Sequence, residues 1–257
     1  FHGWISSESF RDSLAHYEGR CLAFAHPTLS DGPDANAAWL LENLPSTHSW
    51  CFDVVSHSRG GLVARSLACQ SDNNCTVRRM ILVASPNYGT KLADARYWTT
   101  FLDAHTNLLT SLPDGVATIL AEGILCFVKI VGSGATKHLD GLAAMNASTP
   151  FLKQLGTRKP VQPFDVYAIS SHFQPPNIRS LKQLLLKGGD LVVEQFFSEP
   201  NDLVVPTLGC SQGEYDAVGF PVPAGNLLPL EGTVNHCTYF EDGTVQSALR
   251  DWLTQER

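Results

Sequence analysis

Short apolar runs alternate with amphipathic stretches along this chain, and the alternation predicts its elements. Four apolar segments have the length of a strand and are bounded by turns or proline: residues 20–26, 50–55, 77–84 and 164–170. Apolar positions at helical spacing lie between them, over residues 7–17, from 34 to 44 with Asp34 as the cap, and after Gly60. Strands and helices in alternation are typical of a doubly wound, mostly parallel sheet. The sequence therefore predicts an α/β fold.

A long segment after the third predicted strand has helical rather than strand periodicity. Apolar residues recur every three or four positions from Trp98 to Leu112, and residues 116–131 are apolar nearly all round. We expect a helical cap over about residues 91–160, within a single domain spanning residues 1–257. The cap either packs over the sheet and fills space or forms a lid whose inner surface lines an acyl pocket. The pattern is equally consistent with both.

Further elements are expected towards the C-terminus. The pattern predicts one or two short helices around Thr149-Pro150, a helix over residues 181–197 and a final helix around residues 245–253.

Composition and charge narrow the function classes. The chain has 257 residues, of which 44% are hydrophobic, which is enough for one large core. A formal charge of −7 without acidic or basic runs argues against a nucleic-acid partner. The most apolar window, residues 116–131, is short for a bilayer span and contains Glu122 and Lys129. A soluble protein without a transmembrane segment is predicted, and transient contact with a membrane surface stays open.

The seven cysteines form no Cys-x-x-Cys pair and show no metal-ligand spacing with the nine histidines. We therefore expect no metal and no cofactor. Cys69 and Cys75 bracket a polar loop and could bridge in an oxidising compartment, whereas the odd total favours a reduced, cytoplasmic one. Phe1 to Trp4 resembles the end of a strand that breaks into a loop, and we expect an upstream segment of a longer chain.

Ser58 is the first candidate for chemistry, because it follows a predicted strand and precedes a predicted helix. A serine at such a sharp corner needs small neighbours two positions away on either side, and these are Ser56 and Gly60. Gly61 lets the helix approach the sheet. The helix N-terminus would offer free amides to an oxyanion. The alternative is a serine in an ordinary loop.

A serine nucleophile requires an imidazole base and a carboxylate that orients it. Asp202 lies in a polar turn before an apolar segment, and His236 lies in a loop before the final helix. Either residue could instead serve only its own loop. Three acids rival Asp202, namely Asp190, Glu199 and Asp216.

Three other histidines have weaker claims. We expect His57 to leave the turn away from Ser58 and to act in packing or orientation. His172 follows a predicted strand and is a second-rank base. His105 lies on a helical stripe, which favours a core or cap residue.

Several blocks resemble the α/β-hydrolase superfamily, and in particular its lipase and esterase branch, which includes lipases and glycosylphosphatidylinositol-inositol deacylase-like proteins. The blocks match its oxyanion loop, nucleophile elbow, acid loop and histidine loop: His2-Gly3, Ser56-His57-Ser58-Arg59-Gly60-Gly61, Asn201 to Pro206 and Asn235-His236. Residues 83–90 and 148–152 are also similar to segments of that branch.

The resemblance implies Ser58 as nucleophile, His236 as general base and Asp202 as its orienting carboxylate. It implies the amides of Trp4 and Arg59 as the oxyanion hole. Two features depart from the pattern. Ser56 replaces the usual glycine, and the strand expected before His2-Gly3 is missing, which leaves the Trp4 amide poorly anchored.

The expected function is therefore a serine hydrolase that cleaves carboxylic esters of acyl or lipid type through an acyl-enzyme. One alternative is a non-catalytic hydrolase-fold domain that serves binding or scaffolding in a larger protein. Another is a thioesterase, amidase, peptidase or transferase with the same triad.

Overall fold

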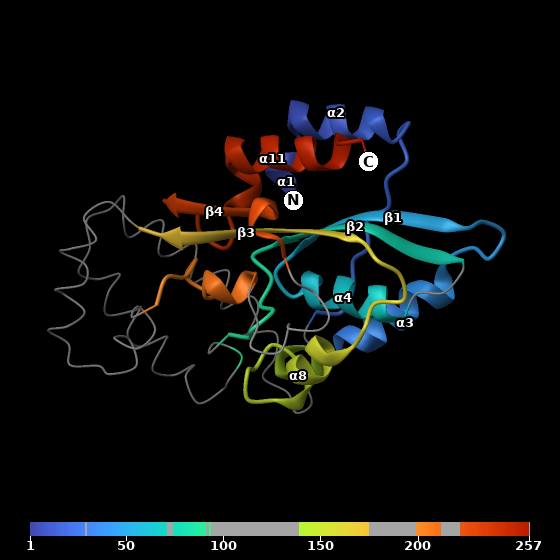
Figure 1. Ribbon diagram of the computed structural model, residues 1–257, viewed down its shortest axis with the longest axis horizontal. Coiled ribbons are helices and arrows are strands. Elements are labelled where there is room, and N and C mark those ends of the chain that lie inside the picture. Colours follow the sequence, from blue (N-terminus) through green and yellow to red (C-terminus); the bar gives the residue numbers. More distant parts are fainter. Residues whose placement is uncertain are drawn as a thin grey trace, which may run out of the picture.

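A parallel sheet forms the centre of the protein, as a computed structural model shows (Figure 1). The structure describes residues 1–28, 30–70, 74–90, 93, 139–174, 199–211 and 222–256. Its four strands are β1 (Trp50–His57), β2 (Cys75–Val83), β3 (Asp165–Phe173) and β4 (Leu227–Gly232). They are hydrogen-bonded in the order β1-β2-β3-β4, and every pair is parallel. The predicted α/β class is confirmed.

Helices cover both faces of the sheet (Figure 1). The upper layer in this view contains α1 (His2–Ile5), α2 (Glu8–His16) and α11 (Gly243–Thr254). The lower layer contains α3 (Pro33–Asn43), α4 (Gly60–Gln70) and α8 (Pro150–Thr157). The short helix α7 (Asp140–Ala143) precedes α8 in the chain.

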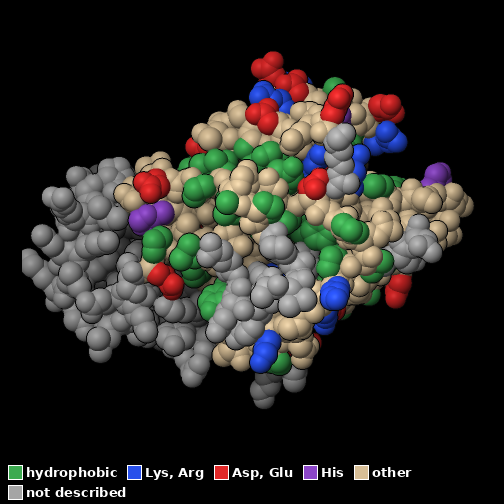
Figure 2. Space-filling model, viewed as in Figure 1, with side chains coloured by type: hydrophobic (Ala, Val, Ile, Leu, Met, Phe, Trp, Pro, Cys, Tyr) green, Lys and Arg blue, Asp and Glu red, His purple; other side chains and the backbone are tan. Residues whose placement is uncertain are grey.

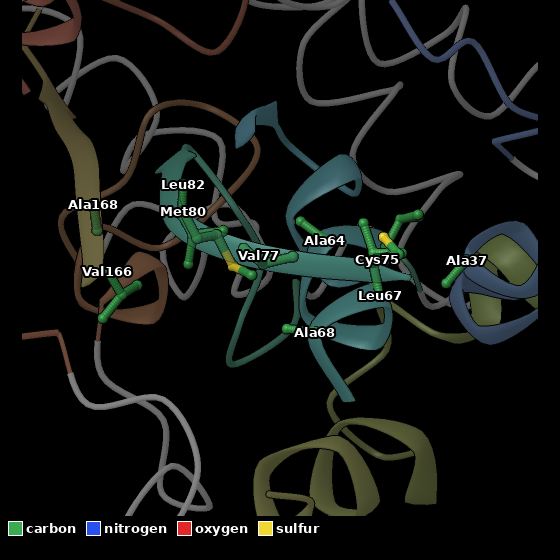
Figure 3. Close-up of a cluster of buried hydrophobic side chains, with 11 residues drawn as sticks. Ala37, Ala64, Leu67, Ala68, Cys75, Val77, Met80, Leu82, Val166 and Ala168 are labelled. Carbon is green, nitrogen blue, oxygen red and sulfur yellow. The ribbon is translucent and has the colours of Figure 1, made fainter. Parts of the chain in front are cut away.

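Each face of the sheet has its own apolar core, because side chains alternate along a strand. On β2, Met80 and Leu82 join a cluster with Ala64 and Leu67 of α4 (Figure 3). Ile81, between them in sequence, belongs to the other cluster, which includes residues of α11. Both faces of β2 are therefore buried over residues 80–83, as the continuous apolar sequence predicts.

Side-chain caps fix the starts of two helices. The Ser7 hydroxyl accepts a hydrogen bond from the Phe10 amide at the start of α2. Asp242 accepts hydrogen bonds from the Thr244 and Val245 amides at the start of α11. Asp34 does not cap α3 as predicted, because Gly32 occupies the cap position and the Asp34 carboxylate pairs with Arg158.

Two predictions of secondary structure in this part of the chain are wrong, and one strand was not predicted. Residues 20–26 are irregular rather than a strand, and no described strand pairs with them. Residues 2–5 form a helical turn, α1, rather than a loop. Strand β4 was not predicted, because it contains Pro229 and alternates too weakly; its place at the end of the strand order explains why a proline is tolerated.

The predicted cap falls mostly outside the described residues. This applies to both long helices expected between residues 91 and 138, and also to the helix expected over residues 181–197. Within the described part, α7 and α8 confirm the short helices around Thr149-Pro150.

Three further predictions concern the surface charges, a membrane-spanning helix and a disulfide. Acidic and basic side chains lie intermingled over the upper layer in Figure 2, as the scattered charges of the sequence predict. No helix in the described part combines the length and the apolar character needed to cross a bilayer. No disulfide joins Cys69 to Cys75, although the sequence left this bridge open.

Candidate active site

Ser58 lies at a strained turn between β1 and α4. Its φ angle is +54°, in the left-handed region that residues other than glycine seldom adopt. The Ser58 amide donates to the Val83 carbonyl, and the Ser58 carbonyl accepts from Gly61 in the first turn of α4. The turn therefore has the geometry of a nucleophile elbow, and the Ser58 side chain remains partly exposed.

Gly61, rather than Gly60, is the position where a larger residue would not fit. A Cβ atom added at Gly61 would lie 2.1 Å from Ser85 Oγ and 2.5 Å from Ser85 Cβ. At Gly60 the nearest atom would be Ser56 Cβ, at an ordinary contact distance of 3.8 Å. The close approach of α4 to the end of β2 thus depends on Gly61, while Ser56 and Gly60 adjoin as the sequence predicts.

His236 connects Ser58 with Asp202. Its Nε2 atom lies 2.9 Å from Ser58 Oγ, and its Nδ1 atom lies 2.9 Å from Asp202 Oδ2. The imidazole is buried, with 1% of the residue exposed. The structure therefore brings together the three side chains that the sequence predicted separately.

Asp202 is buried and accepts four hydrogen bonds. Its Oδ1 atom accepts from the amides of Val204 and Val205, and its Oδ2 atom accepts from His236 and from the Tyr239 hydroxyl. Burial acts to raise the pKa of Asp202, but the charge of His236 and these donors outweigh it and hold the pKa below its usual value. The carboxylate is thus kept ionised beside the imidazole.

His57 packs beside the candidate base. The rings of His57 and His236 have their centroids 4.9 Å apart, and His57 Nε2 lies 2.9 Å from the His236 carbonyl oxygen. Burial, followed by the neighbouring His236, lowers the pKa of His57 to about 3. A neutral His57 with its proton on Nε2 can donate to that carbonyl, which fits the orienting role expected of it.

The turn after β2 holds the acid loop in place. Asn87 donates to the Cys210 carbonyl at 2.6 Å and accepts a hydrogen bond from the buried Arg65 of α4. Thr90, which lies in the same turn as Asn87, donates to the Val204 carbonyl of the acid loop. The sequence marked residues 83–90 only as similar to a family segment, and it did not predict these contacts because the partners are distant in the chain.

The two predicted oxyanion donors lie at helix starts. Arg59 immediately precedes α4, and Trp4 is the third residue of α1, so both amides belong to first turns, which lack acceptors within the helix. Gly3 lets α1 approach the backbone at Phe240, which follows the candidate base His236 in the chain. A Cβ atom added at Gly3 would lie 2.7 Å from the Phe240 carbonyl oxygen. The Trp4 ring packs against the rings of Phe10 and Phe240.

The Arg59 side chain turns away to anchor other segments. It donates to the carbonyls of Gly141 and Asp31 and contacts His26. Burial lowers the pKa of Arg59 to about 10.

Two of the rival residues, Glu199 and His172, lie in the described part of the chain, and neither contacts Ser58 or His236 through a recorded hydrogen bond. Glu199 is exposed, and the recorded side-chain partner of His172 is Gln174. Asp190, Asp216 and His105 lie outside the described residues. Among the residues that the structure describes, no group of three or more histidine, cysteine, aspartate or glutamate side chains has the arrangement of a metal site.

The parallel sheet, the Ser58 turn and the order of the acid and histidine loops along the chain define an α/β protein with an α/β-hydrolase-like fold. A family model described as "Domain of unknown function (DUF7379)" matches residues 1–254, and the chain belongs to this family. No curated protein matches it.

Three solved structures illustrate what the fold is similar to. The mature lipase BlEst2 of Bacillus licheniformis is 16% identical, with a TM-score of 0.47 over 86% of this chain and 71% of that one. A metagenomic carboxyl esterase, MGS0156, is 14% identical, with a TM-score of 0.49 over 95% and 69%. Lipase 1 of Pelosinus fermentans is 18% identical, with a TM-score of 0.47 over 80% and 72%. The roles of the site residues are argued from their geometry alone.

Proposed function

We propose that this protein is a serine hydrolase that cleaves carboxylic esters through a covalent acyl-enzyme. The observation that carries the proposal is the unbroken line of hydrogen bonds from Ser58 through His236 to Asp202, with both links at 2.9 Å. These distances lie within the reach that proton transfer requires. The acyl or lipid character of the substrate rests on the apolar sequence of residues 116–131, which would line a pocket.

The chemistry follows from this line. His236 Nε2 takes the proton of Ser58 as the oxygen attacks the ester carbonyl, and Asp202 stabilises the imidazolium. The tetrahedral oxyanion is held by the amides of Arg59 and Trp4. The imidazolium then protonates the departing alcohol, which leaves an ester between the acyl group and Ser58. Water, deprotonated by His236, hydrolyses that ester and restores the serine.

Labelling with a fluorophosphonate probe tests the proposal, because the probe modifies a serine only when its base is competent. We expect stoichiometric labelling of the wild type and none of Ser58→Ala. Hydrolysis of p-nitrophenyl esters should fall by about 10⁴-fold or more in this variant. Ser56→Ala is the matched control, since Ser56 is a buried serine two residues away that bonds the Ile81 carbonyl. It should still be labelled.

A wild-type protein that folds but takes no label would overturn the proposal in favour of a non-catalytic binding or scaffold domain. Labelling with faster hydrolysis of p-nitroanilides than of matched esters would keep the triad and replace esters by amides as substrates.

A further inference from the structure

Tyr239 contacts the candidate acid at the carboxylate oxygen that the backbone amides do not use. Its hydroxyl donates to Asp202 Oδ2 at 3.0 Å, and this is the same oxygen that His236 Nδ1 contacts at 2.9 Å. Tyr239 is fully buried, with 0% of the residue exposed, and Asp202 is equally buried. The phenol and the imidazole therefore share one carboxylate oxygen in a dry environment.

A shared oxygen has a consequence for basicity. A carboxylate that accepts a phenol hydrogen bond has less negative charge available to stabilise an imidazolium. The Asp202 Oδ1 atom is already engaged by the Val204 and Val205 amides, so it does not take over this role. The phenol hydroxyl thus moderates the interaction between Asp202 and His236.

We propose that Tyr239 is a positioning residue that fixes Asp202 and lowers the basicity of His236 by sharing the Oδ2 atom. The inference rests on the proposed function only for its kinetic consequence. The hydrogen-bond arrangement itself can be tested without turnover.

The phenol stays protonated over the working range. Burial, and then the charge of Asp202, raise the pKa of Tyr239 well above its usual value, so the group remains a donor. The other titratable groups that face the pair are His57 beside the base and Cys210 beside the acid. Burial raises the pKa of the Cys210 thiol, and His57 has a lowered pKa, so both remain neutral near pH 7.

The test uses Tyr239→Phe, which removes only the hydroxyl. We expect the pKa of His236 to rise by about 0.5 to 1 unit, and the acid limb of the kcat/KM profile to move to higher pH by the same amount. The kcat value for a p-nitrophenyl ester should fall by about three- to tenfold, because Asp202 is less firmly fixed, with KM within about twofold. NMR titration of ¹³C-labelled histidine measures the imidazole pKa without any substrate.

Two further proteins sharpen this test. Incorporation of 3-fluorotyrosine at position 239 provides a stronger donor, and we expect the His236 pKa to move to lower values. Tyr167→Phe is the matched control, since Tyr167 is buried in the same apolar cluster and its hydroxyl contacts Gln255. It should leave the His236 pKa unchanged.

An unchanged pKa in both the phenylalanine and fluorotyrosine proteins would overturn the inference, as would shifts in the same direction in both. Should the phenylalanine variant not fold, the fluorotyrosine protein alone decides the question by the sign of its shift. A wild type without fluorophosphonate labelling would refute the proposed function, while the NMR shifts would still support or overturn the role of Tyr239.

Discussion

Two buried aspartates, Asp53 on β1 and Asp202 in the acid loop, each accept a tyrosine hydrogen bond but differ in their ionisable partners. Each side chain is 1% exposed, and each Oδ2 atom accepts a hydrogen bond from a tyrosine hydroxyl. Asp53 also pairs with two arginines, Arg78 and Arg79. The ionisable partner of Asp202 is instead His236.

The difference lies in whether the partner can release its proton. Arginine remains charged at any pH at which proteins fold, so the Asp53 cluster is a fixed ion pair. Arg79 also donates to the carbonyls of Leu253 and Gln255, which ties the sheet to the end of α11. Imidazole exchanges its proton near neutral pH, so the carboxylate of Asp202 is suited to the catalysis that we propose. The ionisable partner, rather than the burial, distinguishes the structural aspartate from the one that we propose to be catalytic.

The largest expected effect is on activity at Asp202. Asp202→Asn should lower kcat/KM for ester hydrolysis by about 10³- to 10⁴-fold, because an amide would hold His236 in the wrong tautomer. The measurement is the initial rate with a p-nitrophenyl ester, on protein whose folded state is checked by circular dichroism. Asp53→Asn is the control and should leave kcat/KM of the folded protein within about twofold. Activity of Asp202→Asn within tenfold of the wild type would contradict the assignment.

The next effect is on stability at Asp53. Asp53→Asn leaves the buried Arg79 without a carboxylate, and we expect the free energy of unfolding to fall by about 3 to 5 kcal/mol. Urea denaturation at pH 7 measures this change. Asp251→Asn breaks the exposed pair with Arg250 and should leave the urea midpoint nearly unchanged. Equal midpoints for both variants would show that the arginines do not depend on Asp53.

The effect that is smallest near pH 7, and that emerges only in acid, is on the pH dependence of stability. The pKa of His57 is about 3 in the folded state, below the ordinary value of 6.5, so the unfolded chain binds the extra proton. The contribution of neutral His57 to the free energy of unfolding is complete above pH 6.5 and is lost as the pH falls towards 3. His57→Gln, which keeps a donor for the His236 carbonyl, should flatten the wild-type decline in this range.

Asp53 should act in a lower range. Burial tends to raise the pKa of Asp53, but hydrogen bonds from Arg78 and Tyr17 and the charge of Arg79 outweigh it and lower the pKa. Its contribution is therefore present above its unfolded pKa of about 3.9 and is lost as the pH falls through the lowered folded value. Urea denaturation between pH 3 and 7 separates His57→Gln from Asp53→Asn.

A plot of the free energy of unfolding against pH for His57→Gln that runs parallel to that of the wild type would contradict the lowered pKa of His57.

The sequence was sufficient to predict those elements whose structure is decided by residues close together in the chain. The apolar run around Met80 to Ala84 predicted a strand buried on both faces, and the small residues around Ser58 predicted the sharp turn. Ser58, Asp202 and His236 were identifiable because each lies in a short motif of its own.

The rest depends on contacts between distant segments. Residues 20–26 have the composition of a strand, yet a strand also requires a partner, and no described strand provides one. Tyr239 and Asn87 lie in unremarkable local sequence, and they matter because the fold brings them to Asp202 and Cys210. No pattern along one segment reveals such a pairing.

The narrow gap between α4 and the end of β2 has a consequence for evolution at this site. Because Gly61 faces Ser85 with no room for a methyl group, even an alanine there would push the helix outward or displace the serine opposite it. Ser58 is attached to that helix through its carbonyl, so it would move as well. A substitution at Gly61 would therefore disturb the position of Ser58 without touching Ser58 itself.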